Sequence, residues 1–334
     1  MIHKVLLADA EFIPPTPPDS ALELMPVTTE SFGRDLWKLV LNALTAVQPE
    51  LYAAAGVCVS LVAVSTLISL VSHSERSKRA IAVCGSVSAS VTLLGSARAL
   101  IRLAAETVTQ ISQYGKLLLP VLTAAMAAQG GATSSAALYA GTAVFDSVLS
   151  SVISNVLVPM VYIYLALVIA GSAIKEPVIG KIKGVVKGGT AWLLKTILYI
   201  FTGYMGITGV VSGATDKHIL KAAKLTISGM VPVVGGILSD ASEAVLVGAE
   251  LMKNAAGIYG LIAITAIWIA PFLKIGIQYL LLKFTAWICS VMDAKPVSDI
   301  AEGFSSAMGL LLAMTGSVCV LQLISAVCFL KGVG

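Results

Sequence analysis

The chain of 334 residues is 57% hydrophobic and only 12% charged, and its formal net charge is +4 at pH 7. A soluble domain usually carries about a quarter charged residues, so this composition excludes an ordinary soluble globular protein. The mean hydropathy of +0.92 is instead typical of an all-α, polytopic helical membrane protein.

The N-terminal residues 1–30 are expected to form an acidic, proline-rich extracytoplasmic segment. Acidic residues outnumber basic residues by seven to three in the first 50 positions, and four prolines between Glu11 and Asp19 favour an extended tether. The first eight residues resemble the end of a secretory signal, but their apolar run is too short for a complete one. Residues 31–50 predict an interfacial amphipathic helix that leads into a membrane domain, residues 51–331.

We expect about seven membrane-spanning helices in this domain. A bilayer core of about 30 Å needs roughly 20 apolar residues per crossing. Seven segments reach or approach that length: residues 51–71, 80–97, 153–174, 192–211, 255–273, 275–292 and 304–330.

Two further apolar stretches, residues 117–151 and 231–254, contain proline and glycine and predict broken or re-entrant helical hairpins. Irregular backbone at membrane depth persists only where it is buried in protein or lines a wet cavity. The candidate helix breaks are Pro120, Gly130 and Gly131 in the first stretch and Pro232, Gly235 and Gly236 in the second.

The prolines also suggest a parallel internal repeat with units 80–174 and 192–273. Pro120 and Pro232 are each followed 39 residues later by another proline, Pro159 and Pro271. Two such units would be related by an axis along the membrane normal. Chance similarity is the alternative, because few other aligned residues are identical.

The distribution of charge predicts the orientation, because short loops rich in lysine and arginine stay in the cytoplasm. Residues 72–79 and 175–195 are such segments, whereas the N-terminal segment and residues 293–302 are acidic and are expected outside. With a tight inner turn at Lys274, these constraints place the N-terminus outside and the C-terminus in the cytoplasm. Lys283 falls within a predicted span, so its side chain should snorkel or face the bundle interior.

Three lysines, Lys217, Lys221 and Lys224, share one helical face that this topology places on the outer side. They predict an interfacial helix with snorkelling lysines. A partner-binding face and an incorrect topology are the two alternatives.

A polar stripe follows on another predicted helix, where Asp240, Glu243, Glu250 and Asn254 lie on one face. Carboxylates on an apolar helix are costly in lipid, so the stripe must face water, a basic partner or a pore. A solvated outer surface and a pore-lining or partner-docking role both remain open. Asp146 is a further candidate, a single carboxylate within an apolar stretch.

The sequence contains no motif that indicates a function beyond a membrane role. The sequence contains no catalytic-serine, zinc-protease or dinucleotide-binding motif, and its five cysteines form no C-x-x-C pair. We therefore expect neither an enzyme nor a cofactor or metal, and no nucleic-acid partner. Arg102 and Glu106 are spaced to form an ordinary helical ion pair.

Five stretches of mixed polar and apolar residues resemble the stage III sporulation protein AE family. They are Leu118–Thr123, Gly130–Ala136, Lys217–Lys224, Val231–Ala241 and Leu251–Gly257. The resemblance implies a membrane subunit of a secretion-like channel complex in the mother-cell membrane around the forespore. It also implies partners among the other membrane subunits of that complex and a protein of the forespore membrane.

Three hypotheses follow, of which the first rests mainly on the resemblance. The chain is a conduit or assembly platform of the sporulation channel, or a secondary transporter that uses Asp146, Asp240, Glu243 and Glu250, or a purely structural scaffold. Discontinuous helices are the usual sign of a transporter site. The transported species and the oligomeric state do not follow from the sequence.

Overall fold

The structure is a computed structural model that describes residues 15–25, 32–71, 75–128, 132–174, 177–207 and 255–331. The described residues are almost entirely helical and include no strand, which confirms the all-α class. The helices are α1 (Asp19–Leu22), α2 (Phe32–Val71), α3 (Glu75–Ala128), α4 (Ala132–Val152), α5 (Val158–Ile174), α6 (Pro177–Ile207), α9 (Ala255–Val291) and α10 (Lys295–Lys331), with the π-helical turn η2 (Ile153–Leu157) between α4 and α5.

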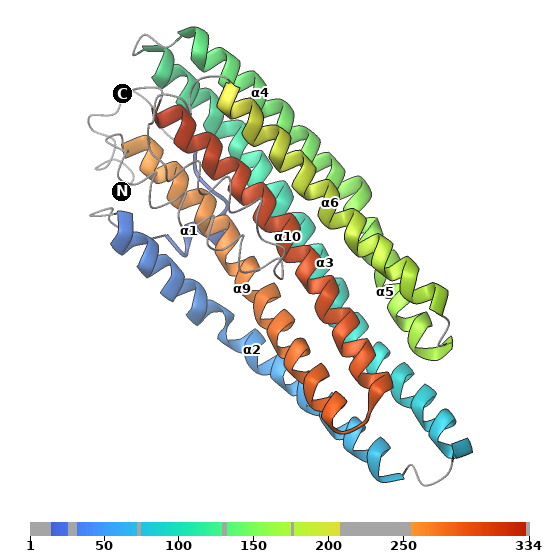
Figure 1. The fold of residues 1–334 in the computed structure, drawn as a ribbon. Coiled ribbons are helices and arrows are strands. Elements are labelled where there is room, and N and C mark those ends of the chain that lie inside the picture. Colours follow the sequence, from blue (N-terminus) through green and yellow to red (C-terminus); the bar gives the residue numbers. More distant parts are fainter. Residues whose placement is uncertain are drawn as a thin grey trace.

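The long helices form an elongated bundle (Figure 1). Helices α4 and α5 continue each other through η2, and this segment runs opposite to α3 before it and α6 after it, as α9 does to α10. Helix α10 lies at the centre of the bundle, because it contacts α3, α4, α5, α6 and α9. In its most apolar stretch of 18 residues, 94% of the residues are buried, against 17% in the peripheral helix α2. The bundle therefore packs around a helix and not around an open axis.

Small residues let neighbouring helices approach α10 closely. A Cβ atom placed at Gly303 would overlap the side chain of Val168 on α5. The central contacts are otherwise made by large apolar side chains, among which Phe304, Leu311 and Phe329 are at most 1% exposed. Without a hydrophobic driving force between helices in lipid, such close van der Waals contacts hold a membrane bundle together.

Five segments of the described chain are long and apolar enough to cross a membrane, which supports the predicted membrane character. They are Gly33–Ser69, Val83–Ala124, Ser135–Ser172, Gly257–Val291 and Lys295–Phe329. The predicted count of seven is not confirmed. Part of the difference is that two predicted spans, 255–273 and 275–292, lie in the single helix α9. The predicted interfacial helix 31–50 likewise continues into the span 51–71 as one helix, α2, from Phe32 onward.

The tight turn expected at Lys274 was wrong, because α9 continues through it and joins the two predicted spans 255–273 and 275–292. The lysine does not need a loop, since its Nζ atom donates a hydrogen bond to the carboxylate of Glu50 on α2. A charge that finds a partner on a neighbouring helix can remain within a long apolar helix.

The merger of the two spans changes which connections share an end of the bundle. The end of α2, the start of α3, the end of α5, the start of α6 and the turn between α9 and α10 lie together at one end (Figure 1). Residues 175–195 and 293–302 were expected on opposite sides of the membrane, but Lys187 and Ser306 are in contact, with 3.2 Å between Nζ and Oγ. That expectation was therefore wrong. The start of α2 and the end of α10 lie together at the other end of the bundle.

The prolines do not end the helices in which they lie. Helix α3 continues through Pro120 to Ala128, so the expected break does not occur at that residue. Before Pro159 the chain widens into η2, in which the N–H of Val158 bonds to the carbonyl of Ile153. A proline ring clashes with the carbonyl four residues earlier, and a π-helical turn relieves that crowding. Gly130, Gly131, Pro232, Gly235 and Gly236 lie outside the described residues, so the hairpins and the internal repeat stay predictions.

The connection between α9 and α10 is a tight turn with a left-handed residue at Asp293, whose φ is 58°. The N–H of Ala294 bonds to the carbonyl of Cys289 at 2.9 Å, and the N–H of Asp293 bonds to that of Ser290 at 3.1 Å. This is the Schellman arrangement that ends many helices. Aspartate tolerates the left-handed region better than most residues other than glycine.

We predict that Asp293→Val lowers the free energy of unfolding by roughly 1–2 kcal/mol, the cost of a left-handed conformation for an ordinary side chain. Asp293→Asn should leave it nearly unchanged, because asparagine accepts the same conformation. Thermal unfolding of the detergent-solubilised protein measures both effects. Equal melting temperatures for the two variants would contradict the role assigned to this turn.

Candidate functional site

Asp146 lies inside the bundle, where three helices meet. It belongs to α4, is 1% exposed, and accepts two hydrogen bonds through its two carboxylate oxygens. Ser112 Oγ of α3 donates to Oδ2 at 2.6 Å. Gln322 Nε2 of α10 donates to Oδ1 at 2.7 Å. We call Ser112, Asp146 and Gln322 the buried polar cluster.

The cluster depends on a glycine that leaves room for the Gln322 side chain. Gly115 is on the same helix as Ser112, three residues later, and a Cβ atom there would overlap the Gln322 carboxamide. Lys116 follows directly and interacts electrostatically with Asp146. Its own position on the helix is exposed, so the partners that hold the carboxylate are the two neutral donors.

Thr142 lies one turn before Asp146 on α4 and adds an unpaired polar atom. The residue is fully buried, and its Oγ1 has no hydrogen-bond partner within the described part of the chain. Most of the other threonines with a described hydrogen bond donate to the carbonyl four residues earlier, as Thr107 does to Leu103. Thr142 is therefore free to take a further partner.

The buried polar cluster lies within segments that can cross a membrane. A buried carboxylate is tolerated when its oxygens are hydrogen-bonded, and in lipid such a residue is a functional candidate by default. Chemically, the arrangement can fix the relative positions of α3, α4 and α10. It can also take up a proton or a small cation.

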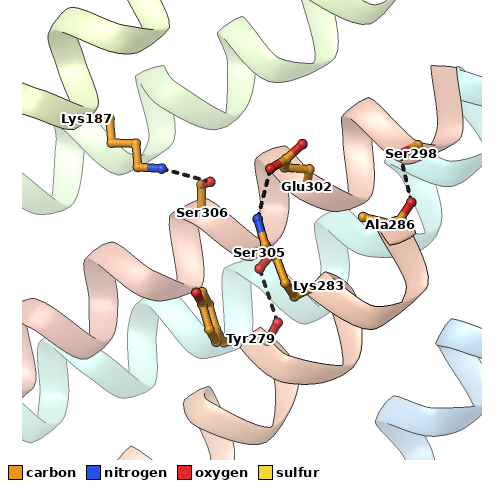
Figure 2. Close-up of polar contacts among 8 residues, drawn as sticks. All are labelled: Lys187, Tyr279, Lys283, Ala286, Ser298, Glu302, Ser305 and Ser306. Carbon is orange, nitrogen blue, oxygen red and sulfur yellow. Dashed lines mark hydrogen bonds and ion pairs between the residues drawn. The ribbon is translucent and has the colours of Figure 1, made fainter. Parts of the chain in front are cut away.

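A second polar group lies where α6, α9 and α10 meet (Figure 2). Lys283 Nζ of α9 forms an ion pair with Glu302 Oε1 of α10 at 2.9 Å, and both side chains are more than half exposed. Lys187 Nζ of α6 donates to Ser306 Oγ of α10 at 3.2 Å. Lys183 and Lys187 also interact electrostatically with Glu302. We call Lys183, Lys187, Lys283 and Glu302 the lysine cluster.

Two serine hydroxyls fix α10 beside α9 next to the lysine cluster (Figure 2). Ser305 Oγ donates to the carbonyl of Tyr279 at 3.1 Å. Ser298 Oγ donates to the carbonyl of Ala286 at 2.8 Å. The sequence left open whether Lys283 would snorkel or face the interior. It lies at the bundle surface, paired with a residue of the next helix.

Of the candidate pore or partner-docking residues from the sequence, Asp146 is the one whose surroundings are described. The carboxylate stripe Asp240, Glu243, Glu250 and Asn254 lies outside the described residues, as does the lysine face Lys217, Lys221 and Lys224. Among described residues, no group of three or more histidine, cysteine, aspartate or glutamate side chains could hold a metal ion. The predicted pair Arg102–Glu106 is confirmed, with 2.7 Å between Nε and Oε1.

Sequence reasoning missed Ser112 and Gln322 as partners of Asp146. Ser112 carries no distinguishing signal, because serines are common throughout the chain. Gln322 had one, since an amide in the long apolar stretch 304–330 needs a partner in lipid. The identity of that partner, 176 residues away, could not be read from spacing.

Comparison with known proteins gives one family. A family model described as stage III sporulation protein AE matches residues 23–332. A curated protein with the same description, from Bacillus subtilis (strain 168), is 23% identical over 235 residues. The match covers 70% of this chain and 59% of that relative, so it spans less than two thirds of the relative's length. No solved structure matches the chain.

We predict that Gly115→Ala destabilises the protein, because the added methyl group displaces Gln322 from Asp146. Overpacking of this kind costs roughly 1–3 kcal/mol. Gly95→Ala in the same helix is the matched control, since a Cβ atom there meets nothing within 4 Å. Its melting temperature in detergent should equal or exceed that of the native protein. Similar melting temperatures for the two variants would contradict the close packing of Gln322.

Proposed function

Because this chain belongs to the stage III sporulation protein AE family, we propose that it is an integral membrane subunit of a secretion-like complex linking mother cell and forespore. The family match over residues 23–332 and five apolar helices support a membrane component of sporulation. We propose a non-enzymatic role, with the other membrane subunits of that complex and a forespore membrane protein as partners. Within the complex, we propose that the chain acts as an assembly platform.

One observation carries the choice of a platform over a conduit along the bundle's own axis. The axis is occupied by α10, whose apolar side chains Phe304, Leu311, Met314 and Phe329 are at most 1% exposed. Its buried hydroxyls Thr315, Ser317 and Ser325 bond to carbonyls of the same helix and line no open path. A conducting path needs polar groups or a wet constriction along its length. If this protein contributes to a conduit, the path runs between copies or between subunits around a shared axis.

The large apolar area outside the bundle also fits a platform. Helix α2 exposes 64% of Trp37, 76% of Tyr52 and 68% of Val59. In a membrane, such faces contact lipid or the helices of other subunits. A helix that packs mainly against one neighbour, α9, has much of its remaining surface available for that purpose.

We call the end of the bundle that holds the end of α2, the start of α6 and the α9–α10 turn the charge-dense end. We propose that it faces the mother-cell cytoplasm. Residues 72–79 and 175–195 carry the lysines and arginines that the positive-inside rule keeps there. The α9–α10 connection shares that end and is placed there too. If each long helix crosses once, both the start of α2 and the end of α10 lie on the opposite side. We therefore propose an external end of α10 in place of the cytoplasmic C-terminus expected from the sequence.

This orientation predicts how introduced cysteines react with an impermeant thiol reagent added to intact cells. Gly188→Cys, on α6 near the charge-dense end, should be labelled only after permeabilisation. Lys331→Cys, at the end of α10, should be labelled without it. The unsubstituted protein, whose Cys84 is exposed, provides the background signal. Labelling of Gly188→Cys in intact cells would overturn the orientation.

A secondary transporter is the second candidate, and the buried carboxylate Asp146 is the observation that favours it. A proton or ion carrier needs a carboxylate enclosed by protein, and Asp146 meets that condition with the unpaired Thr142 beside it. Asp240, Glu243 and Glu250 would be further coupling groups under this hypothesis. The platform hypothesis instead uses Asp146 only to position three helices.

Deleting the gene in its own spore-forming host tests the proposal. A platform predicts few heat-resistant spores together with loss of the fluorescently tagged partner subunits from the membrane around the forespore. Normal spore yield would reject a sporulation role. Lost spores with correctly placed partners would favour a conduit. In the same host, Asp146→Asn should support normal sporulation if the residue only holds helices. The amide oxygen can accept from Gln322 Nε2, and the amide nitrogen can donate to Ser112 Oγ. Loss of spores with this folded variant would favour transport.

A further inference from the structure

The first half of α6 presents an apolar face that no described part of the chain covers. Val178, Val185 and Trp192 are 59%, 73% and 66% exposed. At about 100° per residue they fall within roughly 40° of one another around the helix. Three large apolar side chains on one line are therefore exposed next to the charge-dense end of the bundle.

Next to this apolar line, α6 carries three glycines and therefore has no side chains that project from its surface there. Gly180, Gly184 and Gly188 follow one another at intervals of four, and a Cβ atom at any of them would meet nothing within 4 Å. Unlike Gly303 and Gly115, these glycines are not explained by packing within the described part of the chain. They leave space along α6 between its apolar line and its lysines.

The lysine cluster lies on the other edge of this surface and carries excess positive charge. It contains three lysines and one carboxylate, and that carboxylate is already bonded to Lys283. Lys187 is bonded to a neutral hydroxyl, that of Ser306, and Lys183 interacts with Glu302 only at longer range. Ser306 is also a hydrogen-bond partner of Tyr164 on α5. Two ammonium groups and nearby hydroxyls thus remain able to bind an anion.

We propose that the lysine cluster binds the phosphate of an anionic phospholipid, which lies over the three glycines of α6 and whose acyl chains pass Trp192 into the bilayer. Ammonium groups form strong charge-assisted hydrogen bonds with phosphate oxygens. Basic pockets between membrane helices bind anionic headgroups for this reason. Trp192 is suited to the boundary between headgroups and acyl chains, where tryptophan is enriched. The combination of cations, hydroxyls and exposed apolar side chains matches an amphipathic ligand better than a free anion.

Such a lipid would join elements that are far apart in the sequence. Lys183 and Lys187 belong to α6, whereas Lys283 and Glu302 belong to α9 and α10. A phosphate between them would neutralise the repulsion among the three lysines. The bound lipid would therefore stabilise the contact of α6 with the centre of the bundle. This inference does not depend on the sporulation role.

Native mass spectrometry and thermal unfolding of the purified full-length chain in neutral detergent test the proposal. We expect phosphatidylglycerol to bind and raise the melting temperature, and phosphatidylcholine of the same acyl chains to do neither. The variant Lys183→Gln/Lys187→Gln should bind phosphatidylglycerol about 25-fold more weakly, from about a fivefold loss for each lysine. Free glycerol phosphate should not reproduce the effect, because it lacks acyl chains.

The matched control is Lys38→Gln/Arg98→Gln, which removes two exposed charges from α2 and α3. It should bind phosphatidylglycerol as the native protein does. Both double variants should melt normally without lipid, so that weaker binding is not a folding defect. Equal binding of the two lipids, or normal binding by the lysine variant, would overturn the proposal. So would a dimer that the lysine variant dissociates and that binds no lipid, since the face would then be a contact between copies.

Discussion

The enclosure of α10 is the constraint on which the rest of the bundle depends. A helix surrounded by protein along its length must satisfy its polar side chains from within. Thr315, Ser317 and Ser325 do so locally, each donating to the carbonyl four residues earlier at 3.1, 2.6 and 2.8 Å. Gln322 cannot, because its amide reaches away from its own helix. It bonds to Asp146 on α4, and this single long-range contact brings a carboxylate into the interior.

The two polar groups lie at different depths along the same central helix. Gln322 follows Glu302 by 20 residues, which corresponds to about 30 Å along an α-helix. This is about the thickness of the hydrocarbon core of a bilayer. If the lysine cluster lies at one headgroup layer, Asp146 lies towards the opposite side and not at the midplane, where transporter sites usually occur. The spacing therefore favours a role for Asp146 in holding helices together.

In the described part of the chain, side chains fill the interior of the bundle. The outer apolar faces of the bundle remain able to contact lipid or other subunits. The centre of the described bundle leaves no place for a path lined by water, while α2 and the first half of α6 expose apolar faces to their surroundings. Assembly with other membrane subunits, or with lipid, uses exteriors of this kind. These exposed faces support the proposed role of the chain as an assembly platform.

Composition alone determined that this is an all-α membrane protein, because apolar helices long enough to span a bilayer need no tertiary information to be recognised. Contacts within one helical turn, such as Arg102–Glu106, were equally accessible, since residues four apart always share a face. The tertiary structure decided between alternatives that hydropathy alone cannot distinguish. A lysine between two apolar runs can mark a turn or an ion pair, and Lys274 forms an ion pair because Glu50 reaches it from 224 residues away. The partners of Asp146 and the end of the bundle that each connection occupies were decided in the same way, since both depend on which helices lie side by side.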